Sequence, residues 1–149
     1  MKLLENIPLD TQAIAELIID QGDLNLVWPL ADYPFDHNHW QKVLDPHQGN
    51  KSFFVHVGNH RIGHAALRTT DAVQVYAISF LYLLPEARSR GLGQKIIHLL
   101  ERYARKNLAA RKLILAVQTC NQGAIKCYLK CGFKEYGRKK TSIIMFKLL

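Results

Sequence analysis

The sequence predicts a mixed α/β (α+β) domain with a mostly antiparallel sheet, and two observations indicate this fold class. Residues 51–84 show the pattern of three consecutive strands joined by short turns, which makes them antiparallel neighbours. Residues 77–118 show the pattern strand, helix, strand, and such a crossover makes its two strands parallel neighbours. With 149 residues and 48% hydrophobic content, the chain fits one domain, residues 1–149, with a buried core.

The N-terminal third is predicted to hold one short strand and two helices. Residues 2–6 form the strand, and apolar residues at helical spacing predict a helix over residues 11–21 that ends before Gly22. Asp36 is the expected N-cap of a second helix that runs to about Leu44. The stretch between these helices is of mixed character, and its prolines break any long element.

The middle of the chain is predicted to hold three strands. Apolar residues alternate with others from residue 51 to residue 57, and the Gly58-Asn59 pair is a tight-turn signal. Residues 61–68 form the return strand, and a turn at Asp71 leads into a long strand over residues 73–84.

The last third alternates helices and strands. An amphipathic pattern over residues 92–106 predicts a helix, and the apolar run of residues 112–118 is typical of a strand buried on both faces. Asn121 is expected to cap a helix that runs to Lys130. Residues 133–138 and 142–148 are predicted to form a terminal hairpin.

Charge is distributed unevenly along the chain. Residues 1–60 hold three Lys/Arg and eight Asp/Glu, a net charge of −5. Residues 61–149 hold seventeen Lys/Arg and four Asp/Glu, a net charge of +13. Two halves of opposite sign suggest two unlike ligands, and the alternative is a solvated surface with uneven charge.

The turn after the long strand has the composition of a phosphate site. The apolar run ends at Pro85, and Gly91 and Gly93 open the amphipathic helix. A helix N-terminus carries about half a positive charge and several unpaired N–H donors, so it attracts phosphate. Arg88 and Arg90 add cationic side chains suited to the same oxygens.

Aromatic and acidic residues occur together in the mixed N-terminal stretch. They are Trp28, Tyr33, Phe35 and Trp40, among Asp23, Asp32 and Asp36. Such a combination is suited to a pocket for an amine. The alternative is that the aromatic residues pack this loop onto the core.

Neither a metal nor a membrane span is expected. His37 and His39 have no second pair at ligand spacing, so they are interpreted as histidines on a helix surface. No apolar run is long enough to cross a membrane. Cys120, Cys127 and Cys131 are an odd number in a chain without an export signal, which predicts reduced thiols in the cytoplasm.

Two segments resemble the signatures of the GNAT superfamily of acyl-CoA-dependent N-acyltransferases. Residues 85–93, PEARSRGLG, are similar to its Arg/Gln-x-x-Gly-x-Gly/Ala motif, which alone is weak because Gly-x-Gly turns are common. Residues 121–133, NQGAIKCYLKCGF, resemble its second motif, Asn-x-x-Ala-x-x-x-Tyr-x-x-x-Gly-Phe. Both motifs in this order make the resemblance specific. It covers residues 51–149 well, and the first fifty residues only in outline.

The resemblance implies a GNAT-type sheet with a central, splayed parallel strand pair and helices on both faces. The pantetheine arm of acetyl-CoA, the implied co-substrate, would lie between strands 77–84 and 112–118. Its pyrophosphate would lie on the turn, where a Cβ at Gly91 or Gly93 would obstruct it. The implied cofactor-binding residues are Leu81, Leu83, Arg88, Ser89, Arg90, Gly91, Leu92, Gly93, Gln94, Lys95, Asn121, Ala124 and Tyr128.

The resemblance also implies direct attack of a primary amine on acetyl-CoA in a ternary complex. The backbone N–H of Leu83 would polarise the acetyl carbonyl, and Tyr128 would give a proton to the CoA sulfur. The alternative role of Tyr128 is core packing. Many family members carry a Glu in the strand before the turn, where this chain has Ser79 and Phe80.

Three routes remain open for the amine proton. One is a water relayed by Ser79, Tyr76 or Tyr82, and another is an acceptor that is already neutral. The third is a residue from the acidic N-terminal part, namely Asp32, Asp36, His37 or His39.

A small cationic amine is the first expectation for the acceptor, and a protein N-terminus or lysine is the second. The expected substrate-binding residues are Trp28, Tyr33, Asp36 and Tyr82. Two hypotheses of other classes are a non-catalytic acyl-CoA-binding module and a nucleic-acid-binding protein. The second is disfavoured because aromatic residues are not interleaved with the basic ones. The sequence does not determine whether the chain forms a homodimer.

Overall fold

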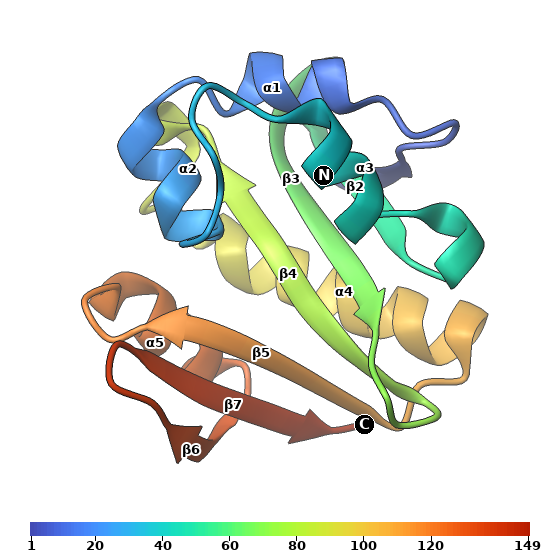
Figure 1. The fold of residues 1–149 in the computed structure, drawn as a ribbon. Coiled ribbons are helices and arrows are strands. Elements are labelled where there is room, and N and C mark those ends of the chain that lie inside the picture. The colour runs from blue at the N-terminus through green and yellow to red at the C-terminus, as the bar shows by residue number, and fades with distance from the viewer.

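One seven-stranded sheet runs through the protein, whose computed structural model describes all residues, 1–149 (Figure 1). The strands are β1 (Lys2–Glu5), β2 (Lys51–Val57), β3 (His60–Thr69), β4 (Val75–Leu83), β5 (Lys112–Gln118), β6 (Lys134–Arg138) and β7 (Ser142–Leu148). Their order across the sheet is β1-β2-β3-β4-β5-β7-β6. Only β4 and β5 are parallel, so the predicted sheet, with one central parallel pair, is confirmed.

Helices cover both faces of the sheet (Figure 1). They are α1 (Thr11–Leu17), α2 (Gln21–Val27), α3 (His37–Val43), α4 (Leu92–Leu108) and α5 (Gln122–Lys130). The α1–α3 group packs on one face and α4 and α5 pack on the other, so the protein has two apolar cores. Neighbouring strand residues divide between them: Leu67 belongs to the α4 side and Ala66 to the α1 side. None of the helices has the length and apolar character that crossing a membrane requires.

The prediction of one continuous helix over residues 11–21 is wrong after Leu17. Helix α1 ends at Leu17, and α2 begins at Gln21 with Gly22 inside its first turn. The side chain of Asp20 accepts a hydrogen bond from the backbone N–H of Asp23 and so caps a new helix. A capping residue within the apolar pattern therefore separates two helices that the apolar spacing alone predicts as one. The other predicted caps, Asp36 and Asn121, are confirmed.

The parallel strands β4 and β5 touch over a short length and then separate. Their register pairs only Val75 with Lys112, Tyr76 with Leu113 and Ala77 with Ile114, and the strands diverge toward their C-terminal ends (Figure 1). We call this opening the wedge. It confirms the predicted splay and leaves one side of each strand without a strand partner.

A bulge in β4 lies beside the wedge. The register between β3 and β4 shifts between His64 and Ala66, and Phe80 has a φ of 53°. A left-handed phenylalanine in a strand is strained, and a bulge bends the strand that carries it. The bulge turns both Ser79 and Phe80 toward the α1–α3 face, because Phe80 packs in that core and Ser79 bonds Arg68 there.

Candidate active site

Two cavities meet at the wedge. The first, of about 500 Å³, lies over the start of α4 and the start of α5, and we call it the cradle cavity. The second, of about 290 Å³, lies between the α2–α3 connection and the strands β4 and β5, and we call it the acceptor cavity. Leu81, Asn121 and Tyr128 line both. A molecule in one cavity can therefore contact a molecule in the other.

The cradle cavity is built from backbone at the start of α4. Gly91 is the N-cap, no side chain caps the helix, and Leu92, Gly93 and Gln94 form its first turn. The N–H groups of a first turn have no acceptor within their own helix. Ser89 and Gly91 both have left-handed φ values, 61° and 72°, and such residues form concave nests of N–H groups that bind anions.

The two glycines of the turn do different things. At Gly91 a Cβ would meet no atom within 4 Å, so the glycine is required by its φ of +72°. At Gly93 a Cβ would lie 3.2 Å from the Sγ atom of Cys127. Gly93 therefore also allows α4 to pack closely against α5, and its expected role in the phosphate path stays a prediction.

The predicted cationic side chains are only partly placed in the cradle cavity. Arg88 lines it, but its Nε donates to the carbonyl oxygen of Leu83 at 2.9 Å and its Nη2 to Asp23 at 3.0 Å. Arg90 and Lys95 are exposed and do not line the cavity. The backbone amides, more than these side chains, therefore face the position expected for phosphate. Lys126 and Lys130 of α5 line it as well.

The backbone N–H of Leu83 points into the wedge. The N–H of Leu84 donates to the carbonyl of Ile62 on β3 at 2.8 Å. Successive amides of a strand point to opposite sides, so those of Leu83 and Leu81 point away from β3, toward the open side of β4. A chain lying in the wedge would meet these donors.

Tyr128 stands where the two cavities meet. It lies on α5, is buried, and its hydroxyl makes no hydrogen bond within the protein. Burial, with smaller effects from the neighbouring Cys127 and Cys131, raises the pKa of Tyr128 above its ordinary value of 10.0. The hydroxyl therefore remains a neutral donor at any physiological pH.

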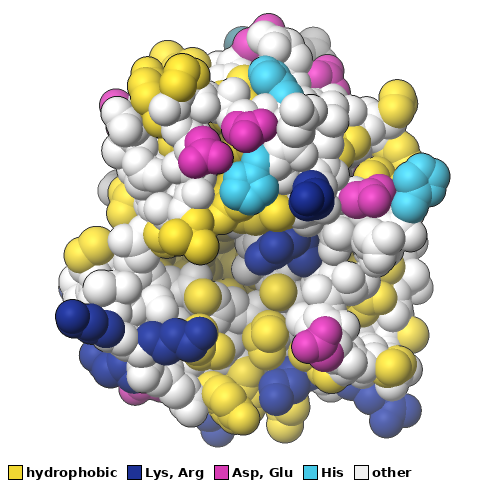
Figure 2. Space-filling model, in the orientation of Figure 1, with side chains coloured by type: hydrophobic (Ala, Val, Ile, Leu, Met, Phe, Trp, Pro, Cys, Tyr) yellow, Lys and Arg dark blue, Asp and Glu magenta, His cyan; other side chains and the backbone are white.

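The acceptor cavity is largely apolar, and it opens in the hollow seen in Figure 2. In that view the hollow separates the part formed by α1–α3 from the part formed by β5–β7, and cationic atoms lie within it. Trp28 and Phe80 form an aromatic wall, with ring centroids 5.2 Å apart. Most other lining residues are aliphatic, and the polar ones are Arg68, Ser79, Gln118 and Asn121, besides Tyr128.

Arg68 is the charged residue of this cavity. Its Nε donates to the hydroxyl of Ser79 at 2.9 Å, and its Cζ lies 4.8 Å from the centroid of the Phe80 ring. No carboxylate lies within ion-pair distance of it. Burial lowers the pKa of Arg68 from 12.5, which indicates that its charge is poorly solvated. Sequence reasoning did not select Arg68 because the face of β3 that carries the site was not known.

Of the four predicted substrate-binding residues, only Trp28 lines the acceptor cavity. Tyr33 is exposed, and Asp36 caps α3. Tyr82 is buried, and its hydroxyl donates to Asp23 at 3.2 Å. Tyr33, Asp36 and Tyr82 do not line this cavity, and their predicted contact with the acceptor stays a prediction.

Among the routes considered for the amine proton, Ser79 is the one that the cavity contains. Tyr76 packs against the core on the opposite side of the sheet. His37 is engaged with the hydroxyl of Thr11 at 2.8 Å. No carboxylate or histidine lines the cavity.

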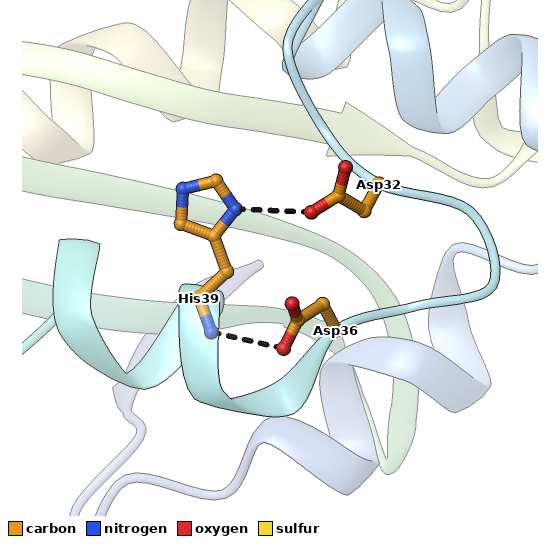
Figure 3. A group of neighbouring side chains, drawn as sticks. All are labelled: Asp32, Asp36 and His39. Atoms are coloured by element: carbon orange, nitrogen blue, oxygen red, sulfur yellow. Dashed lines mark hydrogen bonds and ion pairs between the residues drawn. The ribbon is translucent and has the colours of Figure 1, made fainter.

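Asp32, Asp36 and His39 come together at the start of α3 (Figure 3). Their potential ligand atoms lie within 4.8 Å of one another. One oxygen of Asp36 accepts from the backbone N–H of His39 at 3.2 Å, and Asp32 pairs with the His39 ring at 3.7 Å. A helix cap and an ion pair account for this cluster, so we assign it no metal.

A sequence model of the acetyltransferase (GNAT) family matches residues 13–133. The chain belongs to the GNAT acetyltransferase family. The matched residues of this GNAT acetyltransferase include both motifs, the wedge strands and the cradle turn.

Solved structures show the same fold. Spermidine N-acetyltransferase from Vibrio cholerae, in complex with CoA and spermine, has a TM-score of 0.79 at 19% identity, covering 99% of this chain and 94% of that one. The Campylobacter jejuni N-acetyltransferase PseH, in complex with acetyl coenzyme A, has a TM-score of 0.72 at 23% identity, covering 99% and 97%. An aminoglycoside acetyltransferase in complex with coenzyme A and kanamycin has a TM-score of 0.77 at 18% identity, covering 99% and 94%. A search of curated proteins gives no significant match.

Proposed function

We propose that this GNAT acetyltransferase binds acetyl-CoA and transfers the acetyl group to the primary amine of a small molecule. The observation that carries the proposal is the meeting of two cavities at Leu81, Asn121 and Tyr128. A thioester that reaches this point from the cradle cavity is open to attack from the acceptor cavity. The similar structures solved with CoA, acetyl-CoA, spermine or kanamycin support both halves of the proposal.

Acetyl-CoA would bind mainly to backbone groups of the protein. Its pyrophosphate would accept hydrogen bonds from the first-turn amides of α4, namely those of Leu92, Gly93 and Gln94. Its pantetheine arm would lie in the wedge and pair with free main-chain groups of β4, as a strand would, and the N–H of Leu83 would be left for the acetyl carbonyl. The carbonyl end then reaches Tyr128.

The transfer forms one bond and breaks one. The amine nitrogen forms a bond to the acetyl carbon, and the N–H of Leu83 stabilises the oxyanion that develops on the carbonyl oxygen. The C–S bond then breaks, the hydroxyl of Tyr128 gives its proton to the leaving sulfur, and the tyrosinate takes a proton back from solvent before the next turnover. The amine loses its proton to solvent, directly or through the hydroxyl of Ser79.

The acceptor would be a small amine, which is cationic before it reacts. The aromatic wall of Trp28 and Phe80 suits an ammonium group. The acidic residues of the N-terminal stretch contribute less to the attraction of a cationic acceptor than the sequence suggested. Asp23 is paired with Arg88, and Asp32 with His39.

Thiol release from acetyl-CoA in the presence of a panel of small amines tests the function. The Tyr128→Phe variant should lower kcat about 100-fold or more, the usual loss when a positioned proton donor is removed. Its affinity for CoA, measured by calorimetry, should stay within about twofold of wild type, because the phosphate contacts remain. Tyr136→Phe, on the exposed surface of β6, is the matched control.

Two outcomes would contradict the proposal. An absence of CoA binding would remove acyl transfer altogether. CoA binding without thiol release for any amine would favour a non-catalytic acyl-CoA-binding protein.

A further inference from the structure

We propose that the acceptor carries a carboxylate close to its amine, as an amino acid does, and that Arg68 binds this carboxylate. The proposal rests on the proposed function, which identifies the acceptor cavity. It names the substrate class that the cavity selects.

The charge balance of the acceptor cavity is the first argument. Arg68 is the only charged residue that lines it. The guanidinium has no carboxylate within 4.0 Å, although it lies in a largely apolar and half-buried place. A poorly solvated cation without a counter-charge favours an anionic ligand.

The orientation of Arg68 is the second argument. The Nε–H bond to Ser79 and the face of the Phe80 ring hold the guanidinium on two sides. Both Nη groups remain without a protein acceptor. A guanidinium held in this way presents two parallel N–H donors, the geometry that binds a carboxylate.

The position of Arg68 in the acceptor cavity is the third argument. Arg68 lines the same cavity of about 290 Å³ as Leu81 and Tyr128, so a ligand of that cavity can contact all three. The thioester is proposed to reach this cavity at Leu81 and Tyr128, where the two cavities meet. A molecule that binds Arg68 and attacks there therefore has its anion and its amine only a few bonds apart.

The remaining walls indicate the rest of the acceptor. One cation matches the single charge of a carboxylate, and no second Lys or Arg lines the cavity for a phosphate. The aliphatic and aromatic walls suit an apolar side chain. Polyamines fit less well, because their additional ammonium groups would meet Arg68 and no acidic residue of the cavity. We therefore infer an apolar amino acid.

Three related acceptors test the inference: leucine, leucinamide and isoamylamine, which share a side chain and differ in the carboxylate. The Arg68→Met variant should raise KM for leucine about 10- to 100-fold, the usual loss of a hydrogen-bonded charge pair. It should change KM for leucinamide and isoamylamine less than about threefold. Each ratio compares variant with wild type for one acceptor, so differences in amine basicity cancel.

The control variant is Arg61→Met. Arg61 lies on the same strand, over the ring of Phe54 and away from the acceptor cavity, so the same change of charge should leave all three KM values unchanged. Circular dichroism and thermal melting of both variants show whether they fold. Arg68→Lys should restore part of the leucine affinity, since it returns the charge without the two-pronged geometry.

Binding measured without turnover separates this inference from the proposed function. Leucine titrated into the protein–CoA complex should bind wild type at least 10-fold more tightly than Arg68→Met. An equal loss for leucine and isoamylamine would overturn the inference while leaving acetyl transfer intact. So would tighter binding of phosphoethanolamine than of β-alanine. If no amine caused thiol release from acetyl-CoA but leucine still bound in a way that depends on Arg68, the proposed function would be overturned and the anion site would stand.

Discussion

Tyr128 keeps its hydroxyl proton because its ring is buried. We expect kcat to show no decline with increasing pH up to about pH 10, since the pKa of Tyr128 is raised above 10.0 and the acid form persists beyond its ordinary range. A pH series of kcat at saturating acetyl-CoA measures this. A decline with a midpoint below pH 10 that disappears in Tyr128→Phe would contradict the assigned role.

The acceptor cavity lacks a carboxylate or histidine that could take the amine proton. We therefore expect the rising limb of the pH–rate profile to follow the pKa of the acceptor amine. Two acceptors with different amine pKa values should show midpoints that differ by the same amount. Identical midpoints would indicate an ionising group of the protein instead.

His64 is a fully buried histidine that connects β2 to the bulge of β4. Its Nδ1 lies 2.9 Å from the carbonyl oxygen of Phe80, so this nitrogen carries the proton and donates. Its Nε2 accepts from the hydroxyl of Ser52 at 2.8 Å, and Ser52 in turn accepts from Asn6 at 3.2 Å. The chain of bonds holds the strained backbone at Phe80, beside the wedge.

This histidine makes stability depend on pH. Burial lowers the pKa of His64 from 6.5 to about 4, so below pH 6.5 the unfolded chain binds a proton that the folded protein does not. The free energy of unfolding should fall by roughly 3 kcal/mol as the pH falls from 6.5 to 4. Urea denaturation at several pH values measures this.

The variant His64→Asn separates this effect from other titrations. Asparagine keeps a donor for the Phe80 carbonyl and does not ionise, so the loss of stability between pH 6.5 and pH 4 should be smaller. His60→Asn, at an exposed position on the same strand, should behave as wild type. An unchanged slope in His64→Asn would mean that other groups cause the dependence.

The turn before α4 allows the effect of backbone strain on stability to be measured separately from the effect on CoA binding. Gly91 and Gly58 both have positive φ, +72° and +58°, and neither has an atom within 4 Å of its Cβ position. Substitution by alanine should cost each about 1–2 kcal/mol of stability, because an L-residue is strained there. Only Gly91→Ala should also weaken CoA binding, at least about 10-fold, since only this Cβ enters the cradle cavity.

Calorimetry with CoA and thermal melting measure the two effects separately. Equal CoA affinities for Gly91→Ala and Gly58→Ala would show that the turn does not contact the phosphates.

In the protein as a whole, the two parts of the sheet are joined across a short parallel pairing, and one apolar core on the α4 side spans both parts. Only three residue pairs connect β4 to β5, although each strand continues for several residues. We expect CoA to fill the wedge and protect amides of residues 78–83 and 115–118 from hydrogen exchange. It should also raise Tm by several degrees at saturation, because it binds the folded state alone. Protection elsewhere, with none in these segments, would place CoA at another site.

Local sequence was sufficient for most of the elements. The strands, the helix α4 and the caps Asp36 and Asn121 follow from side-chain periodicity and capping chemistry, which act over a few residues. The two motifs identify the cradle turn and Tyr128 in the same way. The break between α1 and α2 was missed, because Asp20 is compatible with the polar side of one continuous amphipathic helix as well as with the N-cap of a second helix.

Local sequence decides which residues form strands, which turn exposes its amides and where the motifs lie, because these features depend on chemical neighbours along the chain. The packing of the sheet decides the acceptor cavity. Arg68, Ser79 and Trp28 come from three separate segments, and their meeting depends on strand register and on the bulge at Phe80. Asp23 is paired with Arg88 for the same reason: residues distant in sequence become neighbours only when the two faces of the sheet are covered.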